Sequence, residues 1–346
     1  MLRFLRSLVL PAVPPVSDAP VPGEPAPRQV LAPGVAPFEV GPALIDANGL
    51  PLLDWHAVEA WVAGLPDAAS RAQAWAACER AWMAHLADAL GPGYRLQGKG
   101  SALLVSTLPN PLAQATLTFV NKTVQRILRT LDGVASVPEW GQDLLIVFDD
   151  DDTYYRYGAH YYPEGGEFAA SSGMYIHDGC GHFVTVRADL HAVEPVIAHE
   201  LTHACLGHLP IPAWLNEGLA VNTEQRLTPR PALQDPRQLR SRHLAFWGQD
   251  EIQQFWSGKS FLRNDEGNEL SYDLARLLVA QFGADWERFR DFALAAHLAD
   301  GGAAAAWQHL QMDLGAVACA VLAHEPDPRW APLPEQWKEA PEKGAF

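Results

Sequence analysis

The sequence predicts an α+β fold, in which strands and helices come first and helices alone follow. Between residues 94 and 187, short apolar runs of strand length stand among turn residues, and after Glu194 apolar residues recur with helical spacing almost to the end. The order contains no internal repeat and argues against repeated βαβ units. With 346 residues, 48% hydrophobic and 19% charged, the chain can build one large domain or two modest ones.

The composition shifts along the chain predict five regions. A Pro- and Ala-rich start is expected to be an extended, partly disordered tail, which could instead be a propeptide that covers a site. The proposed regions are the tail at 1–40, a helical region at 41–92, a mixed region with strands at 93–209, an all-helical region at 210–325 and a C-terminal tail at 326–346.

Two early segments have the periodicity of helices. Across residues 54–90, tryptophans and aliphatic residues recur at helical spacing until Gly91-Pro92-Gly93 interrupts the pattern. Residues 110–132 are amphipathic, and Asn110 ahead of a proline is suited to cap the start. We expect the tryptophans of these helices to lie in the core.

Strands are expected between and after these helices. Residues 94–106 read as a strand or hairpin that bends near Gly98 and Gly100, and the apolar run 144–148 reads as a buried strand. The four aspartates at 149–152 lack the spacing of a calcium loop, so a solvated loop is favoured. Residues 153–187 are rich in tyrosine and glycine and are expected to form further strands and turns.

The composition also argues against several kinds of binding partner and cellular location. The net charge of −16 argues against nucleic-acid binding, and the apolar runs are too short for a membrane span. Four scattered cysteines, Cys78, Cys180, Cys205 and Cys319, make a disulfide framework improbable. The N-terminus faintly resembles a signal peptide but is interrupted by prolines, so a cytoplasmic location is favoured over a secreted or periplasmic one. A monomer is the default expectation.

The central motif is HELTH at residues 199–203. His199 and His203 are four residues apart, so on a helix both side chains point to one face and can bind one tetrahedral metal ion. Glu200 is rotated by about 100° from His199, which is the position of a general base for water activated by the metal. Pro195 suits the first turn of this helix. Two ordinary histidines on a helix are the alternative interpretation.

A third ligand is expected on the following helix. Pro210 and Pro212 end the first helix, and a new one begins at Ala213-Trp214. A short connection favours an antiparallel return, which can bring Glu217 back to the two histidines. Two histidines and one glutamate leave a fourth position open, as in catalytic zinc sites.

The segment HELTHACLGH followed by LPIPAWLNEGLA resembles the gluzincin metallopeptidases, most closely the peptidase MA-like group. The resemblance implies one Zn²⁺ per chain on His199, His203 and Glu217, with Asn216 and Trp214 in the matching pattern. It also implies a two-lobed zincin-like fold, with a sheet and the active-site helix in the first lobe and a helical second lobe. It covers residues 95–322, most strongly 171–222.

The same resemblance assigns an oxyanion donor to Tyr272, with His243 in reserve. Val221 stands where thermolysin-like enzymes have an acidic residue, and Glu224 could orient a ligand, although a surface role is favoured. The Glu-Asn pair of the related aminopeptidases does not follow Gly173-Met174-Tyr175, which puts aminopeptidase activity in doubt.

Further histidines and cysteines near the motif are interpreted as structural. The spacing of His177, Cys180 and His182 matches no known metal-site pattern. A turn between strands near the substrate cleft is therefore favoured over a second metal site. Cys205 is interpreted as a packed core residue rather than a ligand.

The sequence therefore predicts a zinc peptidase that acts on peptides or proteins, with Glu200 as base and Tyr272 holding the oxyanion. An edge strand at 182–187 could align the substrate by strand addition. A zinc amidase acting on a non-peptide substrate, and a silent protein that binds zinc or peptide, are the alternatives.

Overall fold

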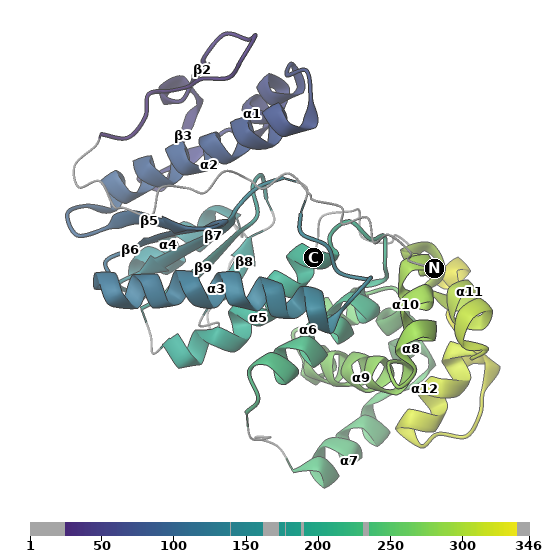
Figure 1. Cartoon of the computed structure of the whole chain (residues 1–346). Helices are drawn as coiled ribbons and strands as arrows, with labels where there is room; N and C mark the ends of the chain where they lie inside the picture. Colours follow the sequence, from purple (N-terminus) through teal and green to yellow (C-terminus); the bar gives the residue numbers. More distant parts are fainter. Residues whose placement is uncertain are drawn as a thin grey trace, which may run out of the picture. The chain divides into compact units, whose positions relative to one another are not determined.

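The computed structural model describes residues 25–138, 140–161, 173–176, 178–187, 190–230 and 235–337. It is a mixed α/β protein in which helices predominate, with elements labelled in Figure 1. The described residues form two compact units. Unit 1 holds residues up to 121, those described within 139–165, and 179–187; unit 2 holds 122–138, those described within 166–178, and the chain from 190 onward.

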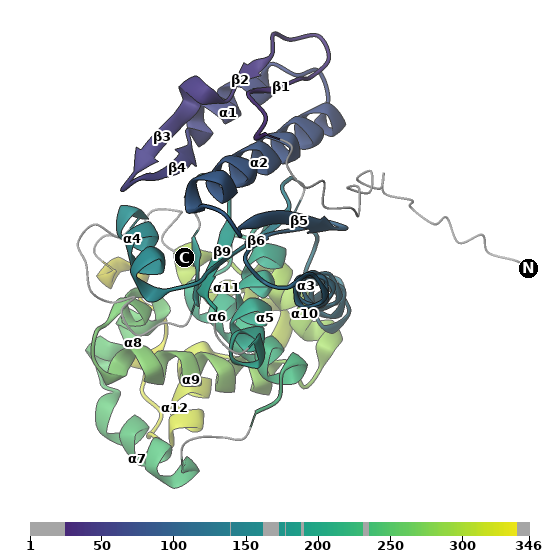
Figure 2. The same ribbon diagram turned by 90° about the vertical axis from the view of Figure 1, so that its left-hand side faces the viewer.

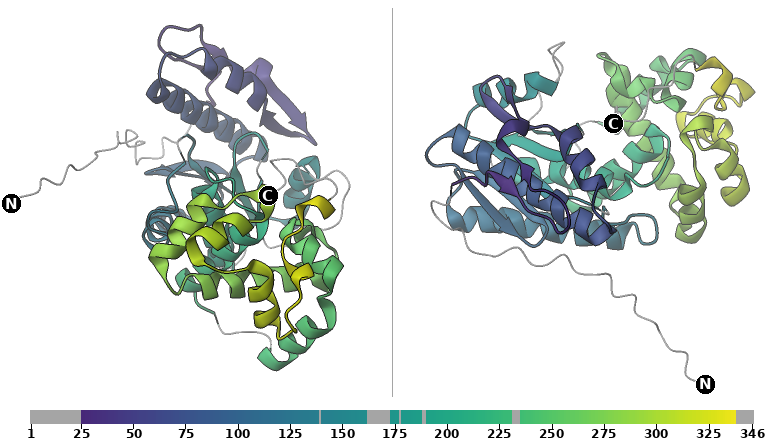
Figure 3. Two further views of the ribbon diagram at one scale, coloured as in Figure 1. Left: turned by 90° about the vertical axis from the view of Figure 1, so that its right-hand side faces the viewer. Right: turned by 90° about the horizontal axis from the view of Figure 1, so that it is seen from above.

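Unit 1 begins with two hairpins that the sequence analysis did not predict. They pair β1 (Gln29–Val30) with β2 (Phe38–Glu39), and β3 (Leu44–Ala47) with β4 (Leu50–Leu53). Val30, Phe38 and Val40 are buried, so the end of the predicted tail belongs to the core. The start of the predicted helical region forms the second hairpin instead of a helix. The hairpins lie beside the helices that follow them (Figures 2 and 3). Residues 1–24 of the predicted tail and 338–346 lie outside the described residues.

The predicted helical stretch at 54–90 is confirmed as two helices, α1 (Trp55–Ala63) and α2 (Ala68–Leu90). Asp54 and Asp67 cap them, because each side chain accepts a hydrogen bond from a backbone N–H in the first turn. Trp82 is fully buried, and its indole donates to the carbonyl of Pro51. The expectation of a core tryptophan is confirmed there.

A five-stranded sheet has the order β5-β6-β7-β9-β8. The predicted hairpin is confirmed as β5 (Arg95–Lys99) and β6 (Ala102–Ser106), with Gly100 in the turn at φ +58°. The strand at 144–148 is confirmed as β7 (Asp143–Phe148), which is parallel to both of its neighbours and has an almost fully buried run.

The expectation that 182–187 is an edge strand is wrong. β9 (His182–Val186) lies between β7 and β8 (Gly173–Ile176), so β8 is the outermost described strand on that side. The physical reason is burial: four of the five β9 residues are buried, as expected for an interior strand.

The expectation of strands and turns directly after residue 153 is also wrong, because α4 (Asp151–Tyr161) is a helix. Asp150 caps it through the N–H of Thr153, and Tyr154, Tyr157 and Gly158 form its buried stripe. The spacing of these buried residues is helical, although tyrosine is favoured in strands. Asp149 and Asp150 remain a loop, and Asp151 begins the helix.

The predicted amphipathic helix is confirmed as α3 (Asn110–Thr130). Its first part belongs to unit 1 and the part from residue 122 to unit 2. The side-chain oxygen of Asn110 accepts a hydrogen bond from Gln97.

Unit 2 confirms the prediction that the chain is almost entirely helical after residue 194. The helix that carries the HELTH motif begins before Pro195, which lies inside it, so the predicted first-turn position is wrong. No helix among the described residues combines the length and apolarity needed to cross a membrane. The α-helices of this unit are α5 (Leu190–Leu206), α6 (Ala213–Leu227), α7 (Pro236–Phe246), α8 (Gln249–Trp256), α9 (Glu266–Phe282), α10 (Trp286–Ala295), α11 (Ala303–Ala305) and α12 (Leu314–Leu322).

The core of unit 2 is built around Trp214, at the start of α6. Its indole is fully buried and donates a 3.0 Å hydrogen bond to the carbonyl of Gly301. Its ring contacts an aromatic set from α8, α9 and α10, which fixes the first turn of α6. That set comprises Phe255, Trp256, Phe282 and Phe292.

Candidate metal centre

Helix α5 presents two histidines on one face. His199 and His203 are one turn apart, and their Nε2 atoms lie only 3.1 Å from one another. His203 is buried, and the side chain of His199 is 13% exposed. The helical repeat that places i and i+4 on one face therefore brings both imidazoles to one point, as the sequence predicts.

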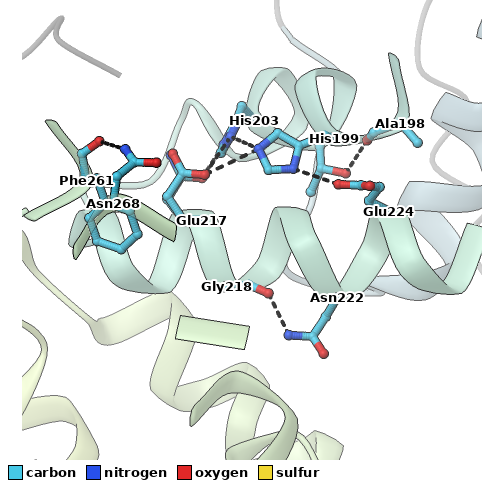
Figure 4. A network of polar contacts seen from close by, with 11 residues as sticks. Ala198, His199, His203, Glu217, Gly218, Asn222, Glu224, Phe261 and Asn268 are labelled. Carbon is cyan, nitrogen blue, oxygen red and sulfur yellow. Dashed lines mark hydrogen bonds and ion pairs between the residues drawn. The ribbon is translucent and has the colours of Figure 1, made fainter. Parts of the chain in front are cut away.

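Helix α6 brings a carboxylate to the same point. Pro212 precedes its first turn, and α6 packs against α5 after the short connection that the prolines predict. Oε2 of Glu217 lies 3.3 Å from Nε2 of His199 and 3.4 Å from Nε2 of His203. Figure 4 shows the three side chains converging from the two helices. Among the described residues, these three form a group whose ligand atoms could hold one metal ion.

The spacing of these three atoms fits a tetrahedral zinc ion. Ligands bound at 2.0–2.1 Å with tetrahedral angles are separated by about 3.3–3.4 Å, and the measured separations are 3.1, 3.3 and 3.4 Å. Oε2 of Glu217 is buried and has no hydrogen-bond partner among the described residues, which leaves a charged oxygen that a cation would satisfy. Two imidazoles and one carboxylate form a donor set that suits zinc.

The hydrogen bonds on the far side of each ring favour the tautomer that a metal requires. Nδ1 of His199 lies 3.2 Å from Oε2 of Glu224, and Nδ1 of His203 lies 3.1 Å from Oδ1 of Asn216. Because both partners are acceptors, a neutral imidazole at either position would carry its proton on Nδ1 and leave the lone pair of Nε2 free for a metal. Two lone pairs and a carboxylate oxygen facing one another repel unless a cation or a proton lies between them.

Glu224, for which a surface role was favoured, is partly exposed and also lies within hydrogen-bond distance of His199. Glu224 lies seven residues after Glu217, so both are on one face of α6, and its side chain is only 31% exposed. The spacing of seven residues was the signal in the sequence that placed Glu224 on the face of Glu217.

The site is electrostatically negative. Burial would lower the pKa of His199, but the carboxylates of Glu217 and Glu224 outweigh it and raise that pKa to about 10. Burial also acts to lower the pKa of His203, but the charge of Glu217 outweighs it, so that pKa is raised as well. The pKa of Glu217 is held well below its ordinary value, because the histidines outweigh burial. The same field that attracts protons attracts a divalent cation.

Glu200 lies beside this cluster without joining the three ligands. Burial raises the pKa of its carboxyl above the ordinary value, while the neighbouring histidines lower it. A carboxylate with a raised pKa takes up a proton more readily than a solvated one. The local environment of Glu200 is therefore suited to a general base.

Helix α9 brings Tyr272 to the same site. The ring centroids of Tyr272 and His199 are 6.4 Å apart, and Phe261 packs edge-on against the tyrosine. Burial and the charges of Glu217 and Glu200 raise the pKa of Tyr272 above its ordinary value, so its hydroxyl stays protonated and can donate a hydrogen bond.

Gly218 permits this close approach of α9 to α6. A Cβ atom at this position would lie 2.5 Å from the carbonyl oxygen of Ala275. Asn222 then joins the two helices, since its amide donates to the carbonyls of Gly218 and Arg276. The roles of Gly218 and Asn222 could not be predicted from the sequence, because they depend on which helix packs behind α6.

The reserve candidate His243 is engaged elsewhere. Its Nε2 lies 2.9 Å from Oδ2 of Asp273, and its Nδ1 accepts from the indole of Trp247. With both ring nitrogens occupied, His243 has no atom left to donate to an oxyanion, and Tyr272 is the better candidate.

The histidine and cysteines outside the motif are structural, as expected. His182 is fully buried between Tyr157 and the carbonyl of Cys180. All four cysteines are buried and none forms a disulfide, which confirms Cys205 as a packed residue. His177 and residues 171–172 lie outside the described residues.

Comparison with known proteins adds no assignment. No protein-family model matches the sequence, and no curated protein matches it.

Proposed function

We propose that this protein is a zinc-dependent peptidase whose metal is held by His199, His203 and Glu217. The observation that carries the proposal is the convergence of two Nε2 atoms and a buried carboxylate oxygen at tetrahedral spacing, with acceptors behind both imidazoles. Ordinary core histidines do not need their lone pairs to face one another. The gluzincin family and its two-lobed zincin-like fold belong to the same proposal.

The residues around the cluster would divide the chemistry of hydrolysis. When bound, zinc acts as a Lewis acid that activates water and polarises a carbonyl group. Glu200 accepts the proton of the attacking water and returns it to the nitrogen of the leaving amine. Tyr272 donates its hydroxyl proton in a hydrogen bond to the oxygen that becomes negative in the transition state.

Glu224 and Asn216 act through the ligands. By accepting a hydrogen bond from each Nδ1, they fix the orientation of the two rings and keep both Nε2 atoms available. Such partners raise the basicity of a ligating imidazole and limit its rotation.

The testing experiment is a mass-spectrometric screen of a mixed peptide library with zinc-loaded protein and its Glu200→Gln variant. We expect cleavage by the wild type and a loss of about 10²–10⁴-fold in rate in the variant, which keeps its zinc. The positions of the cuts separate endopeptidase from terminal activity.

Two results would contradict the proposal. Equal cleavage by the Glu200→Gln variant would exclude Glu200 as the base. An absence of cuts by zinc-loaded protein would favour an amidase on a non-peptide substrate or a binding protein, and a parallel screen of non-peptide amides separates these two.

A further inference from the structure

A pocket lies in unit 2, on the side of α6 away from His199, His203 and Glu217. It has a volume of about 560 Å³ and is formed by the end of α3, by α6, by the end of α9 and by the start of α10. That size is in the range of small-ligand sites. None of the three metal-site residues lines it.

The helical repeat explains why the two sites are separate. Leu219, Asn222, Thr223 and Arg226 line the pocket, and they have the i, i+3, i+4, i+7 spacing of one helical face. Glu217 and Glu224, seven residues apart, occupy the opposite face. Helix α6 therefore forms a wall between the metal cluster and this pocket.

Basic side chains outnumber acidic ones in the lining of the pocket, although the chain as a whole is strongly acidic. Arg129 and Arg226 both line it, and neither forms an ion pair with another described residue. Asp132 contributes the single acidic side chain of the lining, which gives a formal charge of +1. That charge matches a singly charged anion better than a phosphate dianion. Guanidinium groups pair with carboxylates through parallel N–H donors.

The remaining wall is apolar and aromatic. Leu219, Val279 and Phe289 are buried, and Trp286 is fixed by a 3.2 Å hydrogen bond from its indole to the carbonyl of Asp132. Such a wall can cover the hydrocarbon part of a ligand. Thr223, also in the wall, has a buried hydroxyl without a hydrogen-bond partner among the described residues.

We propose that this pocket is a binding site for a small organic monocarboxylate with an aliphatic or aromatic body. The carboxylate pairs with Arg129 and Arg226, and the hydrocarbon part packs against Trp286 and its apolar neighbours. Both arginines also lie in the last turns of their helices, where a positive charge stabilises the helix end. If the two arginines only stabilised their helix ends, the pocket would bind no carboxylate. A binding measurement therefore separates the two roles.

The test uses full-length protein stripped of zinc by a chelator, because carboxylates also bind zinc. Binding of 3-phenylpropionate is measured by calorimetry and by saturation-transfer NMR, with 3-phenylpropanamide as the uncharged control. We expect the acid to bind and the amide to bind at least ten times more weakly. Binding to the stripped protein is independent of whether the protein is a peptidase.

Three variants locate the binding. The double variant Arg129→Gln/Arg226→Gln should weaken it by at least tenfold, and Ala280→Trp, which places a large ring into the pocket from an exposed position, should abolish it. Arg240→Gln, an exposed arginine on α7 outside the lining, should bind as the wild type does. Circular dichroism establishes that each variant is folded.

Several outcomes would overturn the assignment. No binding of the acid, equal binding of acid and amide, or unchanged affinity in the double variant would each do so. Binding that appears only after zinc is restored would place the carboxylate at the metal cluster instead.

Discussion

Two buried histidine sites in this protein differ in what their ring nitrogens face. In unit 1, both nitrogens of His182 have ordinary partners, the hydroxyl of Tyr157 at 2.7 Å and the carbonyl of Cys180 at 2.8 Å. In unit 2, only the Nδ1 atoms of His199 and His203 have such partners, and their Nε2 atoms face each other and a carboxylate. Burial and residue type therefore do not distinguish a packed histidine from a candidate metal ligand. The direction of the unused lone pairs is the better guide.

Replacing one histidine at each of the two sites should give the largest difference, which is a difference in zinc content. His203→Ala is expected to lower the zinc content of dialysed protein from one ion per chain to nearly none, because two ligands hold zinc too weakly. His182→Gln should keep its zinc while becoming less stable. Zinc is measured by atomic emission on both variants. Zinc loss in His182→Gln with retention in His203→Ala would reverse the assignment.

Unit 1 also contains a buried carboxylate, Glu79, which should make the free energy of unfolding depend on pH. Burial raises the pKa of Glu79 to about 8, although Trp75 and the backbone of Gln142 donate hydrogen bonds to it. Since the unfolded chain releases this proton near the ordinary value of 4.5, the free energy of unfolding should fall as pH rises from about 4.5 to about 8. The fall should amount to a few kcal/mol at most.

The Glu79→Gln variant should remove most of that pH dependence, measured by urea unfolding between pH 5 and 9. Asp143, whose burial raises its pKa to about 6, should account for a smaller remainder. Glu59→Gln, at an exposed position on α1, serves as the control and should change little. An unchanged slope in Glu79→Gln would show that Glu79 is ionised in the folded protein.

The smallest expected effect comes from the acceptors behind the imidazoles. Glu224→Ala should weaken zinc binding by about 10–100-fold without abolishing it, because the ring of His199 loses its orienting partner. Gln225→Ala, the exposed neighbour on α6, is the matched control. Competition with a chromophoric chelator measures both affinities. Equal affinities in the two variants would assign Glu224 no role in orienting the ligand.

The sequence was most informative where one physical rule decides the outcome. Helical spacing placed His199 and His203 on one face, and the prolines at 210 and 212 predicted the turn that returns Glu217 to them. The hairpin at 94–106 and strand β7 were equally predictable, because a turn glycine and a short apolar run allow few alternatives.

Prediction failed where tertiary packing decides. The tyrosines of α4 favour strands by propensity, but in the helix Tyr154 and Tyr157 pack against Phe148 of β7. The position of β9 inside the sheet depends on its pairing with β7, which its own residues do not reveal. The contact between Glu224 and His199 was not predictable either, because nothing local indicates that the two side chains lie side by side.

The most direct test of the central claim is anomalous diffraction from crystals of the zinc-loaded protein, recorded on both sides of the zinc absorption edge. We predict one strong anomalous peak between Nε2 of His199, Nε2 of His203 and Oε2 of Glu217. The absence of a peak there, or a peak at another group such as His182, would contradict the assignment of a metal centre to this cluster.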